Sequence, residues 1–319
     1  MSGRFIGRKV LQLVPVLFAV SALSFLLLNL LPGDPTVAIL GPSATTEARV
    51  RLRHELHLDR PLVTRYVHWV GQTATGDLGK SYVSGQPTTE ALRQRLPVTL
   101  ELLALSQLLA LVLAVPLALL AARRPGALLD RVSTSAAFGF LAVPNFMLGV
   151  LLVYLFAVRF RFFPATGYTA LTENPASNLR SLVLPSFTLG VAELAVYLRL
   201  LRSDLIATLA QDYIAMAKAK GLPAWQVLLR HALRPSTFSL VTVAGLNLGR
   251  LVGGAFVVEY LFSLPGIGAL TVESIFKRDY VVVQGTVLLV AVGYVLANFL
   301  VDLLYGILDP RVRHVRAAH

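Results

Sequence analysis

The sequence predicts an all-α integral membrane protein whose six transmembrane helices form one bundle. Of its 319 residues, 55% are hydrophobic and only 14% are charged, and the mean hydropathy is +0.68. A soluble domain of this size has fewer apolar and more charged residues. The apolar residues fall into six long runs, and basic residues gather at the ends of these runs. Both patterns are typical of a protein that crosses a bilayer several times.

Each of the six runs is long enough to form a transmembrane helix. A hydrocarbon core about 30 Å thick needs roughly 20 apolar residues of helix, because backbone groups must be hydrogen-bonded within the segment. Glu193 and Arg250 are the charges inside these runs, which are too long and too weakly alternating for barrel strands. The predicted spans are residues 10–31, 102–122, 132–158, 182–198, 238–258 and 280–301.

The spacing of the spans gives the domain organisation. Residues 1–31 form the N-terminal segment and first helix, and residues 32–96 form an extracytoplasmic insertion that Pro and Gly divide into short pieces. Residues 97–307 are the core, with five helices and a polar loop at 203–236. Residues 308–319 are a C-terminal tail.

The basic flanks predict the orientation. Cytoplasmic loops of membrane proteins carry an excess of Lys and Arg. Basic residues on the opposite side weaken the bias without reversing it, and the apolar run at 10–31 is longer than the core of a cleaved signal peptide. Both termini are therefore expected in the cytoplasm. The residues that define this side are Arg4, Arg8, Lys9, Arg123, Arg124, Arg131, Arg311, Arg313 and Arg316.

Several function classes are disfavoured by the residues present. The net charge of +12 would suit a nucleic-acid partner, but the basic residues flank apolar spans. The absence of cysteine excludes disulfides, thiolate metal sites and a cysteine nucleophile. Residues 74–81 match a relaxed phosphate loop, but the sequence around them does not predict the α/β sheet that such a loop needs. His54 and His57 lie close in sequence, but they lack the spacing of a zinc site. We expect no enzymatic activity and no metal or cofactor bound by this chain.

The polar loop at 203–236 is the most informative interruption. Its composition predicts a helix over 201–220, a stop at Gly221, a restart at Pro223 and a second helix over 225–233. Small side chains in the first helix allow a partner to approach closely, and Trp225 is of a type enriched at interfaces. An amphipathic loop lying on anionic lipid is the alternative.

This loop resembles the EAA loop of ABC-importer permeases, through Ala215, Met216, Ala217, Gly221 and residues 223–235 (PAWQVLLRHALRP). It departs from that pattern in having Ala215 where the family has Glu, and in a Pro235 one residue later than usual. Further segments are similar to the dipeptide and oligopeptide branch of the family. They are residues 4–20, 31–35 (LPGDP), 76–82 (GDLGKSY), 163–168 (FPATGY), 258–268 (VEYLFSLPGIG), 278–285 (RDYVVVQG) and 302–313 (DLLYGILDPRVR).

The resemblance implies a type I importer permease in the plasma membrane of a prokaryote, carrying dipeptides or oligopeptides. Its implied partners are a second, homologous permease chain, two ATP-binding subunits that hold ATP and Mg²⁺, and an extracytoplasmic substrate-binding protein. It also implies that the ATPases dock on the loop. The expected docking residues are Asp212, Ala215, Ala217, Lys220, Gly221, Leu222, Trp225 and Arg230.

Polar residues inside the spans are the candidates for the translocation path. A charge at the centre of a span costs about 2.5–3.5 kcal/mol, so Glu193 and Arg250 are expected to face the bundle interior or a water-filled path. They could pair with each other or contact cargo. Asn145 and Asn247 could bond across helices or line the same path.

Other cargoes and mechanisms stay open at this point. Within the family the solute could be a nickel chelate or glutathione. A self-contained channel or secondary transporter is the alternative of another class, although ion-coupled transporters show internal repeats and none is clear in this sequence. An intramembrane enzyme would need a catalytic constellation that the sequence does not display.

Overall fold

The computed structural model describes residues 15–26, 35–41, 43–55 and 58–308. These residues are mostly helical, and no strand ladder occurs among them beyond an isolated bridge between Lys80 and Pro87. The chain divides into two compact units. Unit 1 contains Met1–Thr99 and Pro265–Leu296, and unit 2 contains Leu100–Leu264 and Ala297–His319.

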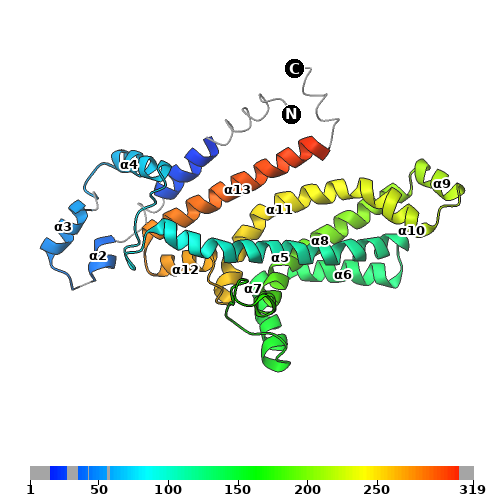
Figure 1. Ribbon diagram of the computed structural model, residues 1–319, viewed down its shortest axis with the longest axis horizontal. Coiled ribbons are helices and arrows are strands. Elements are labelled where there is room, and N and C mark those ends of the chain that lie inside the picture. The colour runs from blue at the N-terminus through cyan, green and yellow to red at the C-terminus, as the bar shows by residue number, and fades with distance from the viewer. Residues whose placement is uncertain (1–14, 27–34, 42, 56–57, 309–319) are drawn as a thin grey trace, which may run out of the picture. The chain divides into compact units, whose positions relative to one another are not determined.

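Unit 1 is built from short helices and the first parts of two long ones (Figure 1). The short helices are Pro15–Leu26, α2 (Pro35–Leu40), α3 (Thr46–Glu55), α4 (Leu62–Ala74) and α12 (Ile267–Phe276). The long helices α5 (Thr88–Arg123) and α13 (Tyr280–Leu308) begin in this unit. The predicted insertion at 32–96 therefore contains three helices and the start of α5.

The loop between α4 and α5 contains the sequence that matched a relaxed phosphate loop. The Ser81 hydroxyl donates to the Asp279 carboxylate, and the Tyr82 amide donates to the other oxygen of Asp279 at 3.2 Å. The Ser81 amide is bonded to the carbonyl of Gln86 at 2.9 Å. A phosphate loop keeps such amides free for the nucleotide. This loop is instead pinned to the residue that precedes α13.

Unit 2 is a helical bundle around α8 (Pro175–Leu209). It contains most of α5 and the last part of α13. Its other helices are α6 (Leu128–Ala142), α7 (Asn145–Leu152) with the π-helix η1 (Val153–Arg159), α9 (Asp212–Ala219), α10 (Ala224–Gln226) with the π-helix η2 (Val227–Ala232), and α11 (Leu233–Leu261). In an apolar stretch of 18 residues of α8, 72% of the residues are buried inside the molecule. The corresponding share is 28% in α5 and 22% in the helix that runs from α10 to the end of α11. Helix α8 is therefore the core of this unit.

A glycine lets α8 approach α5 closely. A Cβ placed on Gly190 would lie 2.6 Å from the backbone oxygen of Ser106. The start of α8 is fixed by Asn174, whose side chain accepts a bond from the Ser177 amide at 3.0 Å, with Pro175 in the first helical position. Both are typical helix-start signals.

Within the part of the chain that the structure describes, four helices are long and apolar enough to cross a membrane: Thr88–Arg123, Pro175–Leu209, Ala224–Leu261 and Tyr280–Val301. They contain the predicted spans at 102–122, 182–198, 238–258 and 280–301. The predicted span at 10–31 lies partly outside the described residues, and Pro15–Leu26 within it is helical.

Among the predicted spans, the one at 132–158 differs most clearly from the structure. It is not one straight helix, because α6 and the α7–η1 helix meet at an angle of 107°. The bend follows from Pro144, since a residue before proline disfavours helical geometry and Val143 is extended with φ −92° and ψ 125°. Counting this bent pair as one span gives up to five candidates among the described residues, so a six-helix count is not confirmed.

The polar loop also differs in detail from the prediction. The helix predicted over 201–220 is broken, because Gln211 is extended and separates the end of α8 from α9. The second predicted helix is not separate, since α10 and η2 continue into α11. The π-helix η2 ends three residues before Pro235. In a regular α-helix the ring of Pro235 would clash with the backbone carbonyl of residue 231, and the wider turn of η2 relieves this clash.

Candidate functional site

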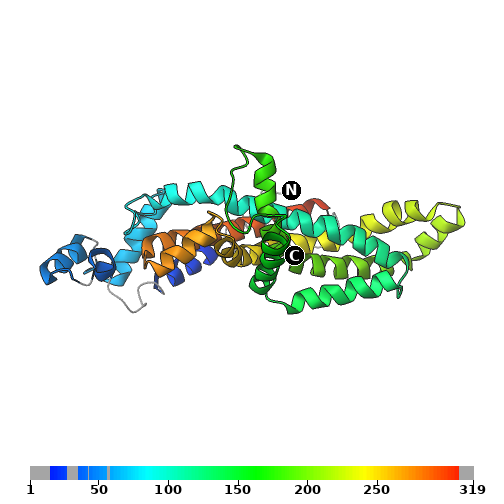
Figure 2. The same cartoon turned by 90° about the horizontal axis from the view of Figure 1, so that it is seen from below.

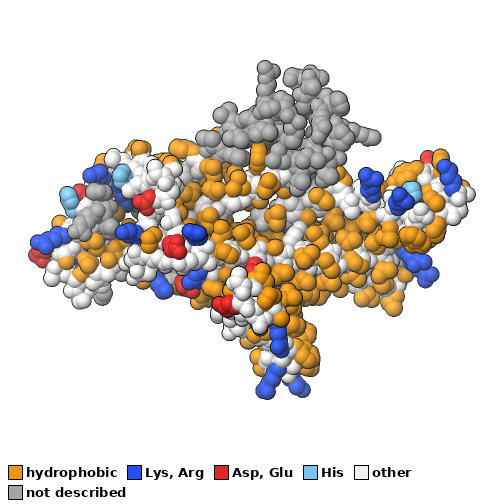
Figure 3. All heavy atoms as spheres, viewed as in Figure 1, with side chains coloured by type: hydrophobic (Ala, Val, Ile, Leu, Met, Phe, Trp, Pro, Cys, Tyr) orange, Lys and Arg blue, Asp and Glu red, His pale blue; other side chains and the backbone are white. Residues whose placement is uncertain are grey.

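The segment from α9 to η2, residues 212–232, lies at one end of unit 2, beyond the end of α8 and the start of α11 (Figures 1 and 2). We call it the docking segment. Figure 3 shows Lys and Arg side chains around this end, next to an otherwise largely hydrophobic surface. The predicted docking residues all lie in it.

A Schellman turn closes α9. The amide of Leu222 donates to the carbonyl of Ala217 at 3.4 Å, and the amide of Gly221 donates to that of Lys218 at 2.9 Å. This pair of bonds needs a left-handed residue at the position of Gly221, whose φ is +78°. No neighbouring atom lies within 4 Å of a Cβ built there. Glycine is therefore favoured by backbone conformation and not by space.

The inner face of the docking segment packs into the unit 2 core. Ile214 and Ala217 of α9 join Val227 and Ala232 of η2 in one buried cluster with residues of α5 and α8, and Leu222 packs against it. Ala217 is only 7% exposed. The methyl group of Ala217 packs into this cluster and so helps to hold α9 in place.

The outer face carries the other predicted docking residues. Trp225 and Met216 are 66% and 60% exposed, and Tyr213 and Leu229 are exposed beside them in sequence. Met216, Tyr213 and Leu229 were not among the predicted docking residues, although Tyr213 lies three residues before Met216 and so shares its helix face. Large apolar side chains between lysines suit a protein partner better than water. The remaining exposed candidates are Asp212, Ala215, Lys220, Gly221 and Arg230.

Two polar contacts tie this end of α8 to its neighbours. The hydroxyls of Thr208 and Ser236 are 3.0 Å apart and join α8 to α11. Arg202 of α8 forms a two-pronged ion pair with Asp130 of α6, with 2.7 Å between Nη2 and Oδ2. Asp130 is 3% exposed and also accepts the Gly126 amide at 2.7 Å. The docking segment thus stands on a rigid base.

A second polar cluster lies within the apolar part of α8 and α11. Glu193 accepts from Asn247 Nδ2 at 2.6 Å and from Arg250 Nη2 at 3.0 Å. The Glu193 side chain is 3% exposed whereas that of Arg250 is 60% exposed. The pair joins two helices, and the arginine reaches out of the bundle surface.

Asn145 lies on a different helix, α7. It begins α7 after Pro144, and its amide nitrogen would lie 3.7 Å from a Cβ built on Gly254 of α11. Closer to Glu193, the Tyr197 hydroxyl donates to Gln107 Oε1 at 3.1 Å and so links α8 to α5.

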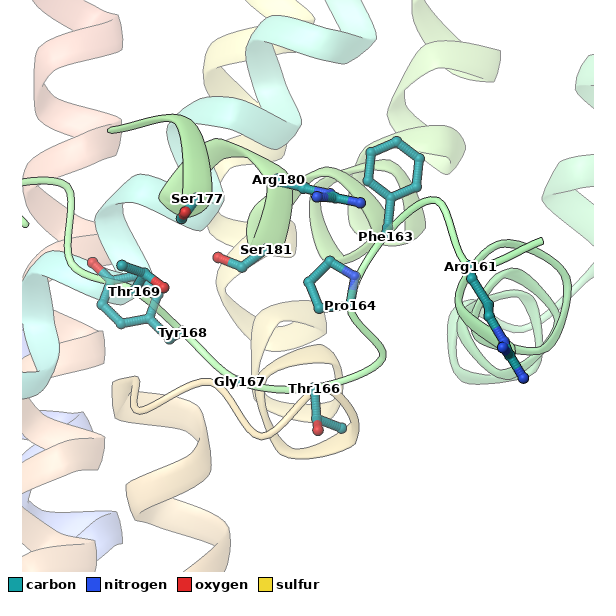
Figure 4. Close-up of a pocket in the computed structure, with 10 residues that line it drawn as sticks. All are labelled: Arg161, Phe163, Pro164, Thr166, Gly167, Tyr168, Thr169, Ser177, Arg180 and Ser181. Carbon is teal, nitrogen blue, oxygen red and sulfur yellow. The ribbon is translucent and has the colours of Figure 1, made fainter. Parts of the chain in front are cut away.

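Unit 2 also holds an open cavity of about 560 Å³ in the connection between η1 and α8 (Figure 4). It is lined by Arg161, Arg180 and several hydroxyl side chains, and it includes the FPATGY sequence at 163–168. Arg180 donates to the Phe162 carbonyl from Nε at 3.0 Å and from Nη2 at 2.8 Å. The guanidinium of Arg180 therefore ties α8 to this connection.

Glu101 at the outer part of α5 holds the same connection. Its Oε2 accepts from the Tyr168 hydroxyl at 2.8 Å and from Asn178 at 3.1 Å. Burial, together with this bond, raises the pKa of Tyr168 to about 12. The phenol therefore stays protonated and keeps donating well into the alkaline range. Sequence reasoning gave Glu101 no role, since one glutamate beside a span has no local partner.

Groups of three or more His, Cys, Asp or Glu that could hold a metal ion do not occur among the described residues. The arrangement offers positioned helices, a projecting surface and an intramembrane ion pair.

Long apolar helices with a charged pair between them define a helical integral membrane protein. The chain belongs to the family of binding-protein-dependent transport system inner membrane components, whose model matches residues 114–314. The N-terminal model of the same transport system components matches residues 2–103.

Relatives match over nearly the whole chain. The probable peptide ABC transporter permease protein y4tP of Sinorhizobium fredii is 38% identical over 313 residues, covering 98% of this chain and 100% of the relative. The oligopeptide transport system permease protein AppB of Bacillus subtilis is 37% identical, covering 97% and 99%. The glutathione transport system permease protein GsiC of Escherichia coli is 36% identical, also covering 97% and 99%. The resemblance to ABC-importer permeases is confirmed.

Proposed function

We propose that this chain is the permease subunit of an ATP-driven importer and forms half of the path for dipeptides or oligopeptides. The full-length similarity to permeases named for peptide transport carries this proposal. A substrate-binding protein delivers the cargo, and a second, homologous permease chain forms the other half of the path. The membrane is the plasma membrane of a prokaryote, with both termini in the cytoplasm.

Two separate ATP-binding subunits supply the energy. Swinging a gate from 1:99 to 99:1 requires about 5.5 kcal/mol of differential binding. The phosphate-loop-like sequence at 74–81 is folded as a pinned turn, so the nucleotide and Mg²⁺ belong to the partners. Closing of the ATPase pair is transmitted through the docking segment of this chain.

The docking segment suits this role because its two faces differ. The outer face presents Trp225, Met216 and Tyr213 to an ATPase groove, with Lys218 and Lys220 at its edge. The inner face, with Ile214 and Ala217, passes the displacement to α8 and α11. Ala217 and Leu222 therefore act as supports, while Asp212, Ala215, Lys220, Trp225 and Arg230 make the contact.

The ion pair between Glu193 and Arg250 suits a position beside the path. A side chain of Arg that is 60% exposed within a span is costly against lipid. Its exposed part is expected to face water in the path or the second permease chain. Asn247 donates a hydrogen bond to Glu193 and is expected to lie on the same side of the path. Asn145 lies on the neighbouring α7.

The docking role is tested by Gly221→Val and Trp225→Ala in the complete transporter. Both variants should insert into the membrane normally but lose the ATPase subunits on purification and lose peptide uptake. Gly85→Val is the matched control, because Gly85 also has a positive φ of +71° and open space around its Cβ position. It should retain the ATPases. Normal uptake by both docking variants would contradict the role.

The cargo is tested by mass spectrometry of solutes bound to the purified assembly. We expect peptides. If glutathione or a nickel chelate is found instead, the chain would be assigned to another branch of the family. Reconstitution separates the classes of transporter. A self-contained channel or secondary transporter would move solute when this chain alone is placed in vesicles, and the importer would not.

A further inference from the structure

The guanidinium of Arg250 is only partly used by its ion pair with Glu193. An arginine presents its N–H donors in a planar fork. Nε and Nη2, which form the side edge of this fork, donate to Oε1 of Glu193 at 3.3 and 3.0 Å. The end edge consists of Nη1 and the second hydrogen of Nη2, and it donates to no group in the described part of the chain. The donors of the end edge are therefore free for a ligand.

Glu193 holds this guanidinium in position. The carboxylate is buried, with 3% of the side chain exposed. Its Oε2 accepts from Asn247 Nδ2 at 2.6 Å, while its Oε1 accepts from Arg250. A buried charge must be paired and hydrogen-bonded, and both oxygens of Glu193 are already occupied. Glu193 is therefore a positioning residue, and the group presented outward is the arginine.

Polar bonds to a third helix stiffen the wall behind the pair. Tyr197 lies one turn from Glu193 on α8 and is fully buried. Its hydroxyl donates to Gln107 Oε1 of α5 at 3.1 Å, and Gln107 Nε2 donates to the Ala244 carbonyl of α11 at 3.5 Å. Helices α5, α8 and α11 are thus linked near the ion pair. A group held by such a wall loses little freedom when it binds a ligand.

The outer side of Arg250 is open. Its side chain is 60% exposed near the middle of the predicted span at 238–258. Gly253 lies one turn further along α11, and a side chain there would extend back toward Arg250. No atom lies within 4 Å of a Cβ built on Gly253. Ionisable residues inside spans face protein or a water-filled path and mark the route of the substrate, so an uncovered guanidinium suits the path.

Given the proposed function of the chain as a peptide permease, we propose that Arg250 binds the C-terminal carboxylate of the cargo as it passes. A carboxylate matches an edge of the guanidinium and accepts two parallel N–H···O bonds from it. Every linear peptide with a free end carries this group, whatever its side chains are. One fixed guanidinium can therefore hold peptides of different sequence. By filling the side edge, Glu193 keeps the end edge turned toward the cargo.

Uptake of two labelled peptides tests this contact in the complete transporter, with its ATPases and binding protein. The peptides are trialanine and trialanine amide, and the measured quantity is the ratio of acid uptake to amide uptake. We expect Arg250→Met to lower this ratio about tenfold relative to wild type, equivalent to about 1.4 kcal/mol. The binding protein is the same in both transporters, so its own preference cancels. An amidated peptide with a glutamate in the middle should be taken up like trialanine amide, whereas uptake like trialanine would contradict recognition of the C-terminus.

Two further variants serve as controls. Arg250→Met combined with Glu193→Gln leaves no unpaired buried charge, and we expect it to show the same low ratio. Leu246→Met changes an exposed side chain one turn away on α11 and should keep the wild-type ratio.

Three results would overturn the contact with cargo. Equal loss of acid and amide uptake in the double variant would indicate that Arg250 contacts the second permease chain instead. Unchanged uptake of both peptides would indicate a contact with lipid. If the wild-type transporter takes up neither peptide, nor any other, the proposed function fails and the contact fails with it.

Discussion

At the scale of single residues, Glu193 shows how this chain tolerates a charge in an apolar helix. The carboxylate is buried and accepts from both Asn247 and Arg250. A buried charge is costly unless it is paired and hydrogen-bonded. The sequence could predict the pairing, because Glu193 and Arg250 are the charges within the predicted spans. It could not predict Asn247, since an amide in a span has many possible partners.

Loss of the arginine should destabilise the bundle. Arg250→Met leaves the buried Glu193 carboxylate without its cation and with the bond from Asn247, and we expect a loss of about 1–3 kcal/mol. The thermal unfolding temperature of the purified transporter measures this loss. The double variant Arg250→Met with Glu193→Gln removes the unpaired charge and should recover most of it. Equal destabilisation of the single and double variants would contradict the charge argument.

Tyr168 makes a similar prediction outside the spans. Its hydroxyl donates to Glu101, so Tyr168→Phe should cost about 1 kcal/mol. Tyr154→Phe is the control, because Tyr154 is 57% exposed. Thermal unfolding of both variants tests the difference, and an equal change in the two would contradict a role for the bond.

The pKa of Tyr168 also predicts the pH range of this contribution. Its folded-state pKa is raised from 10.0 to about 12, by burial first and by the bond to Glu101 second. Folding therefore favours the protonated phenol. The contribution is fully present below pH 10 and is lost as the pH rises through about 12. The difference between wild type and Tyr168→Phe should stay constant from pH 7 to about 9 and narrow above it.

At the scale of helices, close packing of α8 on α5 depends on Gly190. Gly190→Ala would place a methyl group 2.6 Å from the backbone oxygen of Ser106. Backbone cannot move as a side chain end can, so we expect a loss of about 1–3 kcal/mol, as for other overpacked sites. Gly253→Ala is the control on α11, where no atom lies within 4 Å. Detergent-solubilised yield and unfolding temperature should fall for the first variant alone.

The existence of the long helices could be predicted more readily than their shape. Apolar runs gave α5, α8, α11 and α13 because the bilayer imposes a minimum length. Their polar ends, such as residues 88–101 of α5, carry no such signal. The bend at Pro144 was missed, because the run around it contains no charge and hydropathy does not register a change in direction. The break at Gln211 was missed since its surroundings favour helix.

In the docking segment, too, one feature could be predicted from the sequence and another could not. The stop at Gly221 followed from a local rule for helix ends, and the left-handed φ is found there. Which side of α9 faces outward depends on long-range packing. For this reason Ala217 was expected at the surface although Leu201, Leu205 and Ile214 share its buried cluster.

At the scale of the whole molecule, the permease is expected to be inert on its own. Purified alone, it should neither hydrolyse ATP nor accumulate peptide in vesicles. Addition of its ATPases and binding protein should produce both activities together. Phosphate release and uptake of labelled peptide measure them. Accumulation against a gradient by this chain alone would contradict a passive gate driven by separate motors.

The exposed guanidinium of Arg250 has a consequence for how the cell must make this protein. If the proposed second permease chain shields that side of α11, a copy of this chain without it presents a cation on a span to lipid, which is costly. We therefore expect synthesis of the two permease chains to be balanced, with the surplus copy degraded whenever one is produced in excess.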